Sequence, residues 1–204
     1  MGIYSSRARK AKHKKIRKLM HRIGGKVTDE AIQEWRETYK SHLKSGSSAM
    51  TRDDFHRVFT QYYNGDSRTF SDHIFRSFDV NRDGYVDFKE FLVGLYISGC
   101  KDPRRKLGWA FRVYDVDGNG KIGRVEMTSV INAILRLTSQ RYIRLNPAKL
   151  VDEFFSEADK SHVGVLDLET FIHACQKMPV MVDILQCDPS ARAVKRTFFS
   201  RTRS

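Results

Sequence analysis

Oxygen-bearing residues recur at one fixed spacing in two twelve-residue segments, 79–90 and 115–126. Both segments have Asp or Asn at positions 1, 3 and 5, Gly at position 6 and Glu at position 12, and the second begins 36 residues after the first. A Ca²⁺ ion takes about seven oxygen ligands at roughly 2.4 Å, and a tightly turned loop of this length aims positions 1, 3, 5, 7, 9 and 12 inward. The spacing therefore predicts two calcium-binding loops of the EF-hand type, because an accidental acidic turn would rarely satisfy these positions twice in series.

The predicted ligands combine carboxylates, amides and main-chain carbonyls. In the first loop they are Asp79, Asn81, Asp83, Tyr85, Asp87 and Glu90. In the second loop they are Asp115, Asp117, Asn119, Lys121, Gly123 and Glu126. The two Glu residues are expected to close the sites with both carboxylate oxygens, and the glycine at position 9 of the second loop leaves that ligand to water. We expect two Ca²⁺ per chain, and the pattern leaves open whether Mg²⁺ fills the first loop at rest.

Two further segments keep the loop frame but lack its ligands. EF-hands fold in pairs joined by a short β bridge, so a partner is expected at a matching offset on each side. Segment 43–54 has only Leu and Ser at positions 1, 3 and 5, and segment 159–170 has Val163 at position 5 and Thr170 at position 12. Glu169 is one residue away from the closing position, which turns its side chain by about 100° on a helix. Both segments are predicted to be structural loops that bind no calcium.

Helical patterns flank all four loops. Apolar residues recur at helical spacing before and after each loop, and helix starts are marked by Thr28, Thr51, Asp102-Pro103 and Asn146-Pro147. The prediction is an all-α protein with four EF-hands in two pairs, short β bridges between paired loops, and a basic N-terminal arm or helix. The expected parts are an arm at 1–27, a first pair at 28–98, a second pair at 103–188 and a basic tail at 189–204.

The net charge of +13 is concentrated in the two tails. Residues 1–26 contain ten Lys and Arg, residues 189–204 contain five more, and all 24 acidic residues lie between these segments. No apolar run of about 18 residues and no secretory signal is found, so we expect a cytoplasmic chain that lies peripherally on the cytoplasmic face of a membrane. Three widely spaced cysteines without a Cys-x-x-Cys pattern favour reduced thiols, and no catalytic constellation indicates an enzyme.

The N-terminus carries two membrane signals. The first six residues, Met-Gly-Ile-Tyr-Ser-Ser, fit the N-myristoylation pattern with Gly2 as the acceptor. A myristoyl chain holds a membrane only marginally, but each nearby basic residue adds about 1 kcal/mol on an anionic leaflet. The apolar residues Ile16, Leu19, Met20 and Ile23 could face lipid or dock into a groove of the protein itself. Nucleic acid is a disfavoured partner, because no set of aromatic residues for base stacking accompanies the charge.

Four segments outside or overlapping the loops have a characteristic sequence, and they are 33–35 (QEW), 75–79 (FRSFD), 106–120 (KLGWAFRVYDVDGNG) and 185–190 (LQCDPS). On these segments, residues 28–190 resemble the neuronal calcium sensor family. The resemblance implies a calcium sensor that exposes an aromatic groove and engages a membrane-bound cyclase, kinase or channel. The groove residues that it implies are Trp35, Tyr39, Phe55, Phe59, Phe91 and Leu95. A calcium buffer that binds the same ions without opening remains the alternative.

Overall fold

The structure is a computed structural model of the chain, and it describes residues 2–22, 25, 27–60, 67–99, 102–137 and 145–186. The N-terminal helices are α1 (Gly2–Arg22), α2 (Asp29–Ser41), α3 (Arg52–Thr60), α4 (Arg68–Phe78) and α5 (Phe88–Gly99). The remaining helices are α6 (Pro103–Tyr114), α7 (Arg124–Leu137), α8 (Pro147–Ala158), α9 (Leu168–Lys177) and α10 (Pro179–Gln186). None of the helices in these ranges combines the length and the apolar composition needed to cross a bilayer.

Two short antiparallel ladders join the loops in pairs. Strand β1 (Met50–Thr51) pairs with β2 (Tyr85–Val86), and β3 (Ile122–Gly123) pairs with β4 (Val165–Leu166). Met50 lies opposite Val86 and Ile122 lies opposite Leu166, and each of these residues is at position 8 of its loop. The predicted mostly helical fold with short β bridges between paired loops is therefore confirmed.

The polar residues predicted to start helices do cap them. Thr28 accepts a hydrogen bond from the Ala31 N–H at 3.2 Å, and Asn146 accepts one from the Lys149 N–H at 3.2 Å. Asp102 caps α6 in the same way by accepting from the Arg104 N–H at 3.0 Å, ahead of a proline in the first turn. At the start of α3, Thr51 and Asp54 each accept the backbone N–H of the other at 3.1 Å, which is a reciprocal cap. All four predicted helix starts are confirmed.

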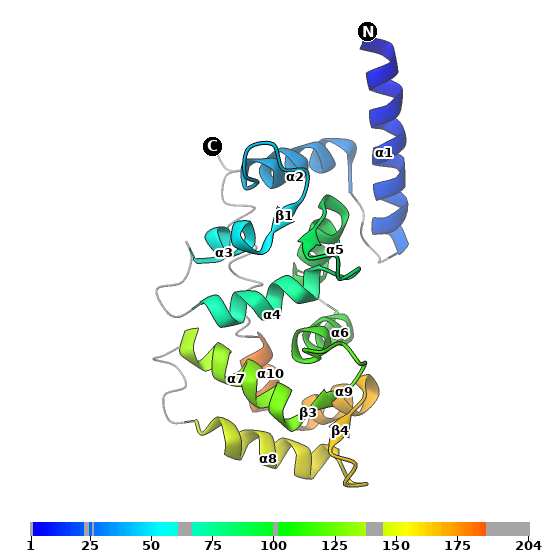
Figure 1. Cartoon of the computed structure of the whole chain (residues 1–204). Coiled ribbons are helices and arrows are strands. Elements are labelled where there is room, and N and C mark those ends of the chain that lie inside the picture. The colour runs from blue at the N-terminus through cyan, green and yellow to red at the C-terminus, as the bar shows by residue number, and fades with distance from the viewer. Residues whose placement is uncertain are drawn as a thin grey trace.

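One hydrophobic core extends through both halves of the molecule. Helix α4 packs against α3 and α5 of its own half and against α6 and α7 of the other half, as its central place in Figure 1 shows. The ring of Phe78 stands edge-on to Trp109 with centroids 6.5 Å apart, and both side chains are buried. Contacts between α4 and α6 therefore hold the two halves together.

Helix α1 is docked at its C-terminal end and projects at its N-terminal end (Figure 1). Ile16 and Met20 are buried in the core, and the amide of Gly25 donates to the Met20 carbonyl at 2.8 Å. Arg17 lies 3.4 Å from the Asp29 carboxylate at the start of α2. The arm thus covers part of the protein's own apolar surface, which is one of the arrangements that its apolar residues allowed. Ile23 lies outside the described residues.

Cys175 is a free thiol in the core, and burial raises its pKa to about 12. Its thiol is therefore protonated at neutral pH and has little reactivity toward oxidants. Cys100, Cys187 and the predicted tail at 189–204 lie outside the described residues.

Candidate calcium sites

In loop 79–90, the closing glutamate reaches back across the loop from the start of α5. The Glu90 Oε1 accepts the N–H groups of Val80 at 3.0 Å and Asn81 at 3.2 Å, and its Oε2 accepts the Asp87 N–H at 2.9 Å. At the other end, the Asp79 carboxylate accepts the N–H of residue 83 at 3.2 Å and of residue 84 at 3.0 Å. The carboxylates at positions 1 and 12 therefore both turn into the loop.

The middle of this loop is folded around its polar side chains. The Asp83 Oδ2 accepts the side-chain amide of Asn81 at 2.9 Å, and its Oδ1 accepts the Tyr85 N–H at 2.9 Å. Gly84 has φ of +84°, a conformation that side chains disfavour, and it provides the sharp bend at position 6. The Tyr85 side chain is 49% exposed, which leaves its main-chain carbonyl as the oxygen available at position 7.

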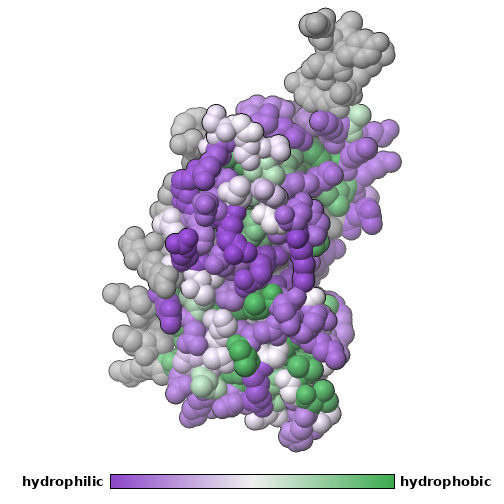
Figure 2. Space-filling model, viewed as in Figure 1, coloured by the Kyte–Doolittle hydropathy of each residue, from purple (hydrophilic) through white to green (hydrophobic). Residues whose placement is uncertain are grey.

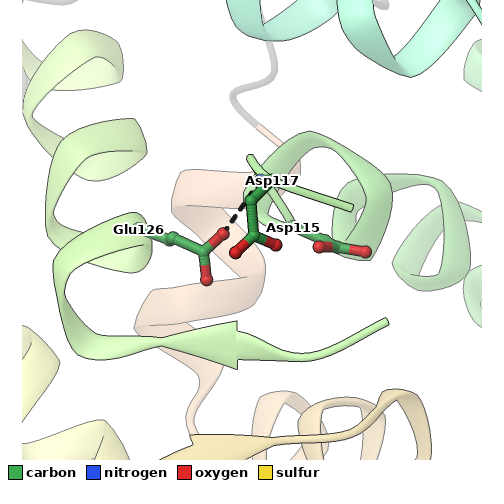
Figure 3. A group of neighbouring side chains, drawn as sticks. All are labelled: Asp115, Asp117 and Glu126. Atoms are coloured by element: carbon green, nitrogen blue, oxygen red, sulfur yellow. Dashed lines mark hydrogen bonds between the residues drawn. The ribbon is translucent and has the colours of Figure 1, made fainter. Parts of the chain in front are cut away.

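Loop 115–126 brings three carboxylates together (Figure 3). One oxygen from each of Asp115, Asp117 and Glu126 lies within 4.8 Å of the others. The Glu126 Oε1 accepts the N–H groups of Val116 at 2.9 Å and Asp117 at 3.2 Å, and its Oε2 accepts the Gly123 N–H at 2.8 Å. Glu90 accepts the N–H groups of the same three loop positions, 2, 3 and 9, in loop 79–90.

The amide at position 5 of this loop joins its two sides. Asn119 donates from its side chain to Asp117 at 2.9 Å, and its own oxygen accepts the Lys121 N–H at 2.8 Å. Gly123 at position 9 has no side-chain oxygen, so a water is needed to complete the set. The carboxylate, amide and carbonyl donors of both loops are the hard oxygen ligands that suit Ca²⁺.

Burial and the crowding of carboxylates raise the pKa of one acidic group in each loop. Burial, followed by repulsion from Asp87 and Asp79, raises the pKa of Glu90. Burial also raises the pKa of Asp115, and the nearby Glu126 and Asp117 raise it further. A divalent cation at the centre of either loop would offset this repulsion, since it adds positive charge where the carboxylates converge.

The two other loops use their acidic groups for structure. Glu169 turns out of loop 159–170 and binds Arg104 on α6 with both oxygens, at 2.5 and 2.8 Å. In loop 43–54, position 12 is Asp54, which is fully buried and is committed to Thr51 and Arg57. Both carboxylates therefore have partners within the protein, and the absence of calcium from these two loops stays a prediction.

One residue that the ligand pattern does not contain connects the two candidate sites. Arg82, at position 4 of the first loop, donates from Nη1 to the Asp117 carbonyl of the second loop at 2.7 Å. A side chain at Gly118 would overlap the Arg82 guanidinium, so the glycine permits the contact. Sequence reasoning missed this link because position 4 is not a ligand position and the two loops belong to different pairs.

The expected groove residues lie in the core of the N-terminal half. Five of the six are at most 5% exposed and the remaining one, Trp35, is half-buried; the five are Tyr39, Phe55, Phe59, Phe91 and Leu95. The rings of Tyr39 and Phe91 are 5.1 Å apart, and those of Phe55 and Phe59 are 6.1 Å apart. Hydrophobic residues form only separate small areas on the face shown in Figure 2. The structure therefore brings these residues together in a closed arrangement.

Comparison with known proteins agrees with this geometry. Residues 104–176 match the family model of the EF-hand domain pair, and residues 71–96 match that of the EF hand domain. The chain is 32% identical to guanylyl cyclase-activating protein 2 of Lithobates pipiens over 166 residues, which cover 78% of this chain and 83% of the relative. It is 31% identical to the protein of the same name from Gallus gallus over 164 residues, 77% of this chain and 82% of the relative.

Human recoverin is a further relative, 26% identical over 174 residues that cover 82% of this chain and 86% of recoverin. These similarities extend over both halves of the chain and include both ligand-complete loops. The chain is therefore an EF-hand calcium sensor that belongs to the neuronal calcium sensor family.

Proposed function

We propose that the protein binds two Ca²⁺, in loops 79–90 and 115–126, and in response regulates a membrane-associated target protein. The names of two relatives, guanylyl cyclase-activating protein 2, favour a membrane guanylyl cyclase among the target classes, ahead of a kinase or a channel. The proposed groove for the target consists of the six residues that the structure holds in and against the N-terminal core.

The main support for this proposal is the hydroxyl group of Tyr39, because it links a calcium loop to the closed groove. Tyr39 on α2 donates to the Val86 carbonyl at 2.6 Å and accepts the Met50 N–H at 3.1 Å, so its hydroxyl is part of the β1–β2 bridge. The Tyr39 ring packs 5.1 Å from Phe91 on α5. Since Val86 is position 8 of loop 79–90, a rearrangement of that loop acts directly on α2 and on the aromatic cluster.

The sensor and the buffer differ in what calcium does to the apolar surface. A sensor exposes the groove, because Ca²⁺ binds the open arrangement better than the closed one. We expect fluorescence of an apolar dye to rise on calcium addition to the wild type and not to Glu90→Gln/Glu126→Gln. The same pair of proteins, used to capture partners from a membrane extract in calcium and in EGTA, identifies the target. A wild type that binds calcium without a dye response would be a buffer.

Replacing Tyr39 by Phe should destabilise the closed state. The variant keeps the ring but leaves the Met50 N–H and the Val86 carbonyl without their buried partner, which costs about 1–3 kcal/mol. Urea unfolding in EDTA measures this loss of unfolding free energy. Tyr85→Phe is the matched control, since Tyr85 is 49% exposed and should tolerate the change. Equal stability of the two variants would show that the Tyr39 hydroxyl does not hold the bridge closed.

The proposed membrane contact uses the exposed basic face of α1 and an acyl chain on Gly2. The side chains of Lys10, Lys14, Lys15 and Lys18 are exposed, whereas Ile16 and Met20 are buried and unavailable to lipid in this arrangement. Because these basic side chains are exposed while the groove is closed, we propose constitutive association that calcium modulates.

Binding of the myristoylated protein to anionic vesicles should occur in EGTA and weaken with salt. The reason is that the Debye length falls from about 10 Å at 0.1 M salt to about 3 Å at 1 M. Co-sedimentation with and without calcium, at both salt concentrations, measures this dependence. Gly2→Ala should bind more weakly at both. Lack of binding in EGTA at low salt would replace constitutive association by a calcium-triggered one, and unchanged binding of Gly2→Ala would remove the acyl chain from the proposal.

A further inference from the structure

A cavity of about 350 Å³ lies where the two halves of the molecule meet, between the two calcium loops. Its walls come from α3, α4, α6 and both loops. Six charged residues line it, and they are Arg52, Arg76, Arg82, Arg112, Asp79 and Asp115. Positive charge therefore exceeds negative charge in a protein whose central segment is slightly acidic.

Two of these arginines occupy equivalent positions in the two halves. Arg76 precedes Asp79 by three residues at the end of α4, and Arg112 precedes Asp115 by three residues at the end of α6. Burial lowers the pKa of both guanidinium groups, and Arg52 lowers that of Arg76 further by repulsion. The two helices that lead into the calcium loops, α4 and α6, thus bring two partly desolvated cations to one cavity.

The acidic groups nearby neutralise these cations only in part. Asp72 on α4 lies 3.6 Å from Arg52 and 3.3 Å from His56, so one carboxylate serves several basic groups. Arg82 uses Nη1 for the Asp117 carbonyl, which carries no full charge. No hydrogen bond or ion pair involves the Arg112 guanidinium among residues 2–22, 25, 27–60, 67–99, 102–137 and 145–186.

We propose that this cavity binds a phosphate-bearing anion. A guanidinium offers a planar fork of N–H groups that pairs with two phosphate oxygens, and such charge-assisted bonds are about twice as strong as neutral ones. The proposed contacts are Arg76 and Arg112, and Arg52 and Arg82 also line the cavity. The cavity has room for a phosphorylated small molecule or a lipid headgroup as well as for an inorganic phosphate ion.

Calcium should strengthen this binding. Asp79 and Asp115 line the cavity and are also position 1 of the two calcium loops, so their negative charge opposes an anion when the loops are empty. Ca²⁺ offsets that charge. By linkage, the anion raises calcium affinity by the same factor as calcium raises anion affinity.

The test is calorimetric titration of the full chain with inositol 1,4,5-trisphosphate, first in EDTA and then in calcium. In EDTA the calcium sites are empty, so binding there depends on the cavity alone. A lack of binding in EDTA would therefore contradict the anion site without contradicting the proposed calcium sensor. We expect Arg76→Gln/Arg112→Gln to weaken binding by about 10-fold or more. Arg104→Gln/Arg105→Gln is the matched control, because it removes the same charge from α6 outside the cavity, and it should change affinity less than about 2-fold.

Equal weakening by both double variants, or no binding by the wild type, would overturn the site. Thermal unfolding verifies that the cavity variant is folded, and shifts of the Arg76 and Arg112 side-chain N–H resonances of the wild type on addition of inorganic phosphate test the site without a variant. Absence of such shifts would also overturn it. Equal affinity in EDTA and in calcium would overturn the coupling.

The source of the phosphate group is distinguished with vesicles. Vesicles containing phosphatidylinositol 4,5-bisphosphate are compared with phosphatidylserine vesicles of equal surface charge. If the wild type prefers the vesicles with phosphatidylinositol 4,5-bisphosphate and Arg76→Gln/Arg112→Gln does not, the ligand is a lipid headgroup. Equal binding to both kinds, together with loss of inositol trisphosphate binding in the variant, indicates a soluble phosphorylated ligand.

Discussion

Glu90→Gln should eliminate calcium binding in loop 79–90, and Glu126→Gln should do the same in loop 115–126. Each glutamate joins the start of its loop to position 9, and an amide in its place removes one charge and one of the two carboxylate oxygens expected to bind the ion. We expect the affinity of the altered site to fall by about 100-fold or more, on the order of 3 kcal/mol. Calorimetry should give two sites for the wild type, one for each single variant and none for the double variant.

Glu169→Gln is the control for this experiment. Glu169 is adjacent to the closing position of its own loop but is held outside that loop by Arg104. Its replacement should leave two calcium sites and weaken only an exposed ion pair, which is worth roughly 1 kcal/mol or less. A loss of one calcium ion in this variant would show that loop 159–170 binds calcium, and three ions in the wild type would show that loop 159–170 or loop 43–54 does.

Gly94→Ala should cause a large loss of stability for a change of one methyl group. A Cβ at Gly94 on α5 would lie within 2.5 Å of the Phe78 ring, which is 1% exposed and packs against both Phe55 and Trp109. Because the ring has no room to move, the overpacking should cost about 1–3 kcal/mol or more. Thermal and urea unfolding in EDTA measure the loss.

Gly108→Ala is the matched substitution in the adjacent helix α6. Apart from its chain neighbours and the backbone of α6 itself, no heavy atom in the described part of the chain lies within 4 Å of a Cβ built at Gly108. Ala also favours a helix by about 1 kcal/mol over Gly. This variant should be as stable as the wild type or more stable. If Gly94→Ala were equally well tolerated, the close approach of α5 to the Phe78 ring would not contribute to stability.

The parts of the structure that the sequence predicted best are those with a fixed local geometry. A calcium loop needs its ligands at set positions, so Asp79 to Glu90 could be recognised without knowing anything distant in the chain. The cap formed by Thr51 and Asp54 is equally local, because it is set by a spacing of three residues. The pairing of Met50 with Val86 followed from the frame of the two loops.

The sequence was less informative about features that depend on contacts between distant parts of the chain. The apolar stripe of α1 is compatible with lipid and with protein, and only the fold shows that Ile16 and Met20 enter the core. The same ambiguity affects the groove, since the aromatic residues that line an open groove are also those that fill a closed one. The contact of Arg82 with the opposite loop required the relative placement of the two pairs, which no local pattern contains.

If Gly2 is acylated, the docked position of Ile16 and Met20 would also give α1 a mechanical role. With its C-terminal end fixed in the core, a 21-residue helix is a rod of roughly 30 Å, and Gly2 lies at its far end, about 20 Å along the axis from Ile16. A lipid attached to Gly2 would therefore connect the membrane to the free end of α1 rather than to the folded body. The helix would then act as a rigid spacer that sets both the height of the calcium loops above the bilayer and the direction in which the body faces its target.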